Sequence, residues 1–168
     1  MQDIGALEAY AEATSSAVMS LAAQALDKVK AEEANEAIRH AGIAYALTGL
    51  LRALPLHASQ GRLMLPADIL LARNVDPHDV LAGNANEELR GAIADVAGHA
   101  RAHLASARAG RYDGAILPAL LPASLDAHLP PVNRDPNLFA CLTQADFNLR
   151  LLRVGQANSK QELWRRLL

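Results

Sequence analysis

The sequence predicts an all-α protein, a single-domain helical bundle over residues 1–168. Two observations lead to this prediction. Apolar residues recur every three or four positions through several long windows, which is the period of a helix with one buried face, and no useful stretch alternates as a strand does. The composition agrees, because 51% of residues are hydrophobic but only 4% aromatic. Alanine supplies much of that apolar content, and helices with alanine on their contact faces can pack closely.

Two helices are expected in the first third of the chain, over residues 5–27 and 32–54. The predicted buried face of the first consists of Leu7, Tyr10, Thr14, Ala17, Val18, Leu21 and Ala25. That of the second consists of Ala34, Ala37, Ile38, Ala41, Tyr45, Thr48 and Leu51. Pro55 should end or sharply kink the second helix, because proline removes a backbone donor and disfavours helix at the residue before it. The residues after Pro55 are expected to form a loop.

Shorter helices should follow, over residues 67–72 and from Asp76, an N-cap residue placed before Pro77. A long helix over 86–109 should close at Gly110, with an inner stripe of apolar residues. These are Leu89, Ile93, Val96, Ala97, Ala100, Leu104 and Ala107. Further helices are predicted around 119–128, over 135–154, and from a capping box of Ser159 and Glu162.

Charge and hydropathy exclude several classes of protein. A net charge of −2 and a pI near 6.3 provide no basic surface for nucleic acid. No window reaches the roughly 18 apolar residues of a membrane-spanning helix, and the N-terminus lacks a basic leader, so we expect a cytoplasmic protein with at most peripheral membrane contact. Cys141 is the single cysteine, which excludes an intrachain disulfide and favours a buried thiol.

Two pairs of residues have spacings that a metal site could use. Glu8 and Glu12 lie four apart, as do His99 and His103. Carboxylates in the first turns of a helix are more often solvated and favoured by its dipole, and two histidines without a third ligand are weak support. The sequence therefore predicts no metal, no catalytic residue and no cofactor.

The most distinctive stretch is residues 41–66, an apolar helical run that leads to Arg52 and then a segment closing with Gly61-Arg62 and Pro66. Its spacing resembles the second signature of the squalene/phytoene synthase family, Q-x-T-N-x-x-R-D-x-x-E-D followed by G-R-x-Y-x-P. The positions that keep this frame are Leu47, Thr48, Leu50, Leu51, Arg52, Gly61, Arg62, Leu65 and Pro66. The acidic positions hold Ala53, Leu56 and His57 instead.

Family enzymes ionise a diphosphate with magnesium, which needs carboxylate oxygens that alanine and leucine cannot supply. The replacements resemble the L-R-A-x-P-x-H-x-S pattern of the non-catalytic branch of the family, whose members are needed for assembly of respiratory complex I. Upstream, Tyr10-Ala11-Glu12, Thr14 and Ser16 resemble the Y-A-E-x-T-x-S of that branch. The resemblance covers the later part of the family fold, so it implies a truncated isoprenoid-synthase-like fold.

The resemblance implies a catalytically inactive protein that binds, in respiratory-complex assembly or to an isoprenoid or lipid. The candidate ligand-binding residues are Leu47, Thr48, Leu51, Arg52, His57 and Arg62. For each leucine the alternative is packing against a neighbouring helix. We expect a homo-oligomer or a protein partner, and a cytoplasmic location, peripheral at the inner membrane. The alternative function is a subunit or fragment of a head-to-head prenyl transferase completed by another chain, or a piece of a longer gene product.

Overall fold

The computed structural model describes residues 1–84 and 86–125, and within these ranges it contains helices and no strand. The all-α prediction is therefore confirmed. The elements are α1 (Ile4–Ala11), the π-helix η1 (Glu12–Ser16), α2 (Ala17–Leu26), α3 (Lys28–Glu33), α4 (Asn35–Arg52), α5 (Leu54–Ser59), α6 (Ala67–Ala72), α7 (Pro77–Ala82), α8 (Glu87–Ala109) and α9 (Leu117–Leu125). The helices predicted over 135–154 and from Ser159, and the environment of Cys141, lie outside the described residues.

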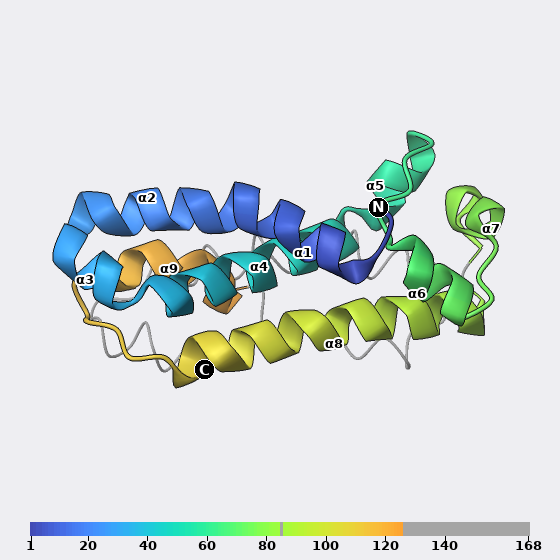
Figure 1. The fold of residues 1–168 in the computed structure, drawn as a ribbon. Helices are drawn as coiled ribbons and strands as arrows, with labels where there is room; N and C mark the ends of the chain where they lie inside the picture. Colours follow the sequence, from blue (N-terminus) through green and yellow to red (C-terminus); the bar gives the residue numbers. More distant parts are fainter. Residues whose placement is uncertain (85, 126–168) are drawn as a thin grey trace.

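Helix α4 is the central element of the bundle. It lies between the continuous α1–η1–α2 rod and the long helix α8 (Figure 1). Its buried residues point in all directions around the helix and are mostly small: Ala37, Ile38, Ala41, Gly42, Ile43, Ala44, Ala46, Leu47, Thr48 and Leu51. Small side chains let two neighbouring helices approach α4 closely from opposite sides. The predicted face of this segment is confirmed except at Tyr45, which is only half-buried.

The tightest approach to α4 is made by η1 in the first rod. The Ser16 hydroxyl donates a hydrogen bond of 2.7 Å to the backbone carbonyl of Arg39. A Cβ added to Gly42 would collide with the backbone of Ser16, so this crossing requires glycine on α4. Because a π-helical turn inserts an extra residue, it shifts which side chains face inward. The rod accordingly buries Leu7, Ala11, Ser16, Met19 and Ala23, with a step of five residues between Ala11 and Ser16.

The face predicted for the first helix is wrong except at Leu7. Tyr10, Val18 and Leu21 are 45%, 66% and 66% exposed, and Thr14, Ala17 and Ala25 are exposed as well. The sequence carries two apolar stripes on this helix, and periodicity alone favours the one with larger side chains. The structure buries the stripe of small residues instead, because only that stripe can come close to Gly42.

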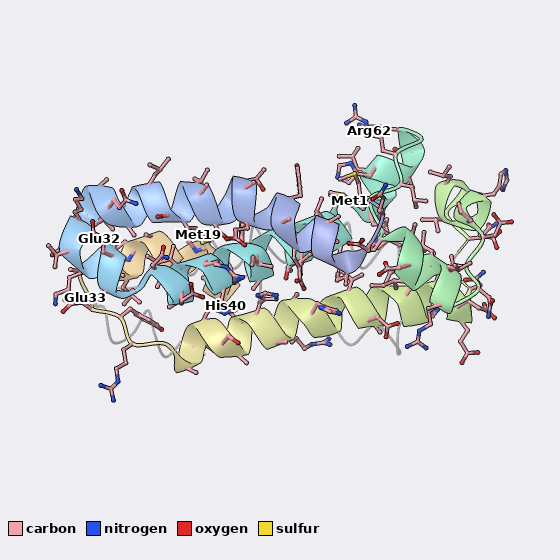
Figure 2. The ribbon with its side chains drawn as sticks, in the orientation of Figure 1. Met1, Met19, Glu32, Glu33, His40 and Arg62 are labelled. Atoms are coloured by element: carbon pink, nitrogen blue, oxygen red, sulfur yellow. The ribbon has the colours of Figure 1, made fainter. Side chains whose placement is uncertain are left out.

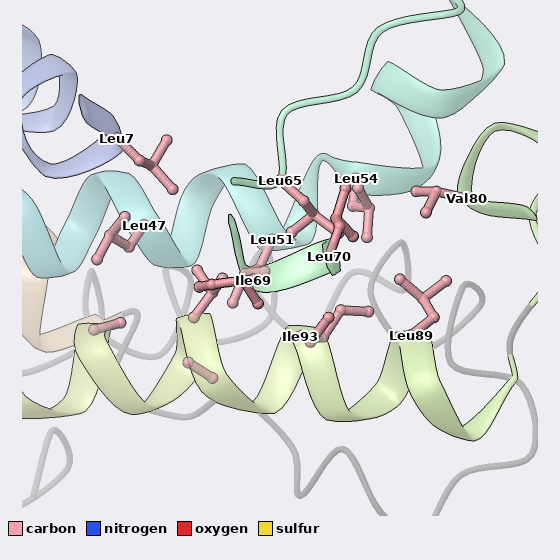
Figure 3. Packing of buried hydrophobic residues seen from close by; sticks show 14 of the residues in the cluster. Leu7, Leu47, Leu51, Leu54, Leu65, Ile69, Leu70, Val80, Leu89 and Ile93 are labelled. Atoms are coloured by element: carbon pink, nitrogen blue, oxygen red, sulfur yellow. The ribbon is translucent and has the colours of Figure 1, made fainter. Parts of the chain in front are cut away.

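Two hydrophobic clusters fill the described part of the bundle. The larger joins the second half of α4 to α1, α6 and α8, and includes Leu7, Leu47, Leu51, Leu54, Leu65, Ile69, Leu89 and Ile93 (Figure 3). The smaller joins α2, the first half of α4 and α9, and includes Met19, Ile38, Ile116 and Leu120. The inner stripe predicted for α8 is confirmed except at Leu104, which is half-buried.

Capping and proline set the breaks between elements. Asp76 accepts a hydrogen bond from the His78 N–H at 2.8 Å, so its predicted N-cap is confirmed. Asn86 also caps its helix, because it accepts a hydrogen bond from the Leu89 N–H at 2.8 Å. Helix α4 ends at Arg52, as Pro55 predicted. The loop expected after Pro55 is wrong, because proline fits the first turn of a new helix and α5 forms there.

Gly42→Ala should destabilise the protein by about 1–3 kcal/mol, because the added methyl group would force α4 and η1 apart. The matched control is Gly49→Ala on the same helix, where a Cβ meets nothing within 4 Å. That change should be neutral or stabilise by up to about 1 kcal/mol, since alanine favours helix. Chemical denaturation of both variants measures the difference. Equal stabilities would contradict the close crossing.

Candidate functional site

The signature segment forms one end of the bundle, where α4 gives way to α5 and the loop up to Pro66. The loop folds back on α5, because the Arg62 N–H donates a hydrogen bond of 2.8 Å to the His57 carbonyl. Gly61, with φ of +69°, makes the left-handed turn that this requires. Figure 2 shows the Arg62 side chain directed away from the bundle. The Gly61-Arg62 frame thus forms the turn that closes α5 and leads into the loop to Pro66.

The N-terminus is tied to the end of this segment. The Ala67 and Asp68 N–H groups donate to the carbonyls of Met1 and Gln2 at 3.2 and 3.3 Å. The Asp68 carboxylate accepts from the Ile4 N–H at 3.3 Å. The start of α1 is therefore held against the exit of the signature loop.

Three of the six predicted ligand-binding residues lie inside the packed core. Leu47 and Leu51 are 0% and 1% exposed and pack with residues of α1, α6 and α8 (Figure 3). Thr48 is buried too, and its hydroxyl donates to the Ala44 carbonyl at 2.8 Å. These contacts are those of helix packing. The other three, Arg52, His57 and Arg62, lie at or near the surface, the first two half-buried and the third exposed.

His57 has a feature that the sequence did not predict. Its Nδ1 atom is buried and is the one side-chain nitrogen or oxygen without a hydrogen-bond partner among the buried side chains that the structure describes. Leaving a buried polar atom unpaired costs about 1–3 kcal/mol. Such an atom is a candidate contact for a bound molecule or a partner.

At two of the acidic positions of the family signature the structure has apolar side chains, which supply no oxygen ligand. Ala53 is half-buried at the end of α4, and Leu56 is 57% exposed on α5.

Over residues 1–84 and 86–125, no group of three or more His, Cys, Asp or Glu side chains is arranged to hold a metal ion. In the same ranges no helix is both long and apolar enough to cross a membrane.

Three of the four residues considered as metal ligands, Glu8, His99 and His103, come together in one cluster, whereas Glu12 pairs with Arg39 at 3.2 Å. Glu8 Oε1 lies 3.0 Å from His99 Nδ1 and 3.3 Å from His103 Nε2, and His103 Nδ1 lies 2.8 Å from His40 Nδ1. Glu8, which was expected to be solvated, is half-buried, and its carboxylate contacts both histidines. Sequence analysis missed His40, since a single histidine on an apolar helix carries no pattern. The i, i+4 spacing of His99 and His103 was the available signal.

A continuous apolar surface runs along the first rod on the side away from α4. We call it the α1–α2 stripe and define it as Tyr10, Thr14, Val18 and Leu21, all exposed. Their spacing of four, four and three residues is that of a seam between packed helices. This stripe is uncovered in the described part of the protein.

The profile of the squalene/phytoene synthase family matches residues 1–153, so the chain belongs to that family. Among curated relatives, a rat protein is 34% identical over 136 residues, which cover 79% of this chain and 40% of the relative. A human protein is 36% identical over 107 residues, which cover 64% of this chain and 32% of the relative. Both are named NADH dehydrogenase (ubiquinone) complex I, assembly factor 6.

The chain therefore spans at most about two fifths of the length of these relatives. No solved structure matches it significantly. The resemblance inferred from the frame between Arg52 and Pro66, including its likeness to the non-catalytic branch, is confirmed by the family profile and by these relatives.

Leu51→Ala should destabilise the protein by about 2–5 kcal/mol, because the side chain is part of the core rather than the wall of an open groove. Leu56→Ala removes the same atoms from an exposed position on α5 and should change stability by less than about 0.5 kcal/mol. Denaturant titrations of the two variants test whether Leu51 belongs to the core. A Leu51→Ala protein as stable as the wild type would show that this side chain lines a groove instead.

Proposed function

We propose that this protein acts by binding another protein during assembly of a respiratory complex, and that it does not catalyse prenyl transfer. The observation that carries the binding part is the α1–α2 stripe, an apolar helix face that no other helix of residues 1–84 and 86–125 covers. The process is suggested by the relatives, which are named as assembly factors of complex I.

The chemistry of the stripe favours a helical protein partner. Three large side chains, Tyr10, Val18 and Leu21, lie between 45% and 66% exposed along one helix. Burying apolar surface contributes about 25 cal/mol per Å², so covering these side chains favours association. Their spacing fits an apolar helix laid along the rod. The occupant we propose is such a helix from a partner polypeptide. In purified protein the same stripe of a second copy can take its place, so self-association is expected.

The loss of acidic residues argues against the alternative of a prenyl transferase completed by another chain. A partner could restore the first carboxylate set of the family. It would still leave the magnesium ions without the second set, because Ala53 and Leu56 provide no oxygen ligand. Peripheral attachment at an inner membrane remains part of the proposal, since complex I assembly is the process suggested by the relatives.

The buried Nδ1 of His57 favours a second candidate function, binding of an isoprenoid or lipid by its polar head. The His57 ring would hydrogen-bond an anionic or carbonyl-bearing head group, and the exposed Arg62 supplies a cation on the loop that follows α5. Leu47 and Leu51 pack in the core, so the apolar tail would lie elsewhere, and the exposed Leu56 beside His57 is one candidate contact. This binding is compatible with an assembly role.

The double substitution Val18→Asp with Leu21→Asp should abolish self-association and partner binding, because two carboxylates on the stripe cannot be buried against an apolar helix. The fold should survive, since both side chains are exposed. The measurements are the sedimentation coefficient of the purified protein and the amount of assembled complex I in cells that depend on this gene. Both values should be lower for the double variant than for wild type.

Leu71→Asp is the matched control, because Leu71 is 79% exposed on α6, away from the stripe. It should behave as wild type in both measurements. Full complex I assembly with the double variant would overturn the proposal. If the wild-type protein sediments as a monomer and still supports assembly, only the expected self-association is wrong.

A further inference from the structure

A hydrogen-bonded line of four side chains crosses the middle of the bundle and connects three helices. His40 of α4 contacts His103 of α8, which contacts Glu8 of α1, and Glu8 also contacts His99 of α8. Figure 2 labels His40 on α4 where that helix faces α8. His40, His103 and Glu8 are half-buried and His99 is exposed. This cluster is separate from the signature segment and from the open stripe.

His99 and His103 both contact Glu8 Oε1, and His103 passes the line of contacts on to His40, so the four side chains do not surround one position. His103 uses Nε2 toward Glu8 and Nδ1 toward His40, so its two nitrogens point to different partners. A metal ion would need three or more ligand atoms around one position. The geometry of the cluster therefore suits the sharing of protons rather than the binding of a cation.

The contact between the two imidazoles limits how many protons the cluster can hold. At 2.8 Å between His40 Nδ1 and His103 Nδ1, one nitrogen must donate and the other accept. When both rings are fully protonated, two N–H groups face each other and the hydrogen bond is lost. Glu8 can balance one imidazolium by direct contact, but it reaches His99 and His103 and not His40.

The surroundings of His40 oppose a charge on that ring. Burial is the main reason that its pKa lies below the ordinary value, followed by repulsion from His103 and Arg39. Glu36 on α4 and Glu12 on η1 act in the opposite direction, and Glu12 is engaged by Arg39 at 3.2 Å. A lowered pKa in the folded protein means that the unfolded chain binds more protons at mildly acidic pH. Stability from this group is then full above about pH 6.5 and is lost as pH falls from there toward the folded value.

We propose that the His40–His103–Glu8–His99 line is a proton-sensitive latch that fastens α1 and α4 to α8 at neutral pH and releases them on acidification. Its release acts on the same rod that carries Tyr10, so it also loosens the first part of the α1–α2 stripe. The latch concerns the stability of the bundle and does not depend on the proposed function.

Thermal unfolding between pH 8 and pH 5 tests the latch with the whole chain. The Tm of wild type should fall by several degrees as pH drops through 6.5. His40→Gln should lose a large part of that fall, because the ring that resists protonation is gone. His78→Gln, which removes an exposed histidine on α7, is the matched control and should follow wild type. Equal falls in wild type and His40→Gln would overturn the proposal.

A second measurement tests the latch even if the His40→Gln protein does not fold. The histidine ring signals of wild type, followed by NMR, should show His40 becoming protonated below the ordinary pKa of a histidine. The protection of the α1 amides against exchange, after correction for the intrinsic pH dependence of amide exchange, should fall once His40 is protonated. A His40 signal that titrates at the ordinary pKa of histidine, or α1 protection that is the same at pH 8 and pH 5, would contradict the latch.

Discussion

The close crossing of η1 over α4 is the constraint on which the rest of the structure depends. Ser16 bonds to the Arg39 carbonyl, and Gly42 leaves no side chain between the two backbones. With the first rod seated so tightly, α8 packs against another side of α4 and the larger core closes between them. The π turn is what aligns Leu7 and Ala11 on one side of the crossing with Met19 and Ala23 on the other.

The helix that carries the family signature is part of the same packing. Its residues Leu47, Thr48 and Leu51 are buried, and the two leucines pack against α1, α6 and α8. The frame from Arg52 to Pro66 builds the start of α5 and the loop into α6, whose first residues hold the N-terminus. The acidic positions of the signature carry the half-buried Ala53 and the exposed Leu56.

Much of the fold could be predicted from the sequence. The cap at Asp76, the break at Pro55 and most of the inner stripe of α8 are local signals, and the structure confirms them. The buried face of the first helix could not be chosen correctly, because the deciding fact is a contact with Gly42, which lies far along the chain. The His40 contact and the buried Nδ1 of His57 were missed for the same reason. Both arise only when separate helices meet.

This member of the squalene/phytoene synthase family keeps the frame of the signature, and we propose that it does not carry out prenyl transfer. The most direct test is incubation of the purified protein with farnesyl or geranylgeranyl diphosphate, magnesium and NADPH, beside an active synthase and a no-protein control. We predict no squalene or phytoene above the no-protein control. Formation of either product by this chain would contradict the account.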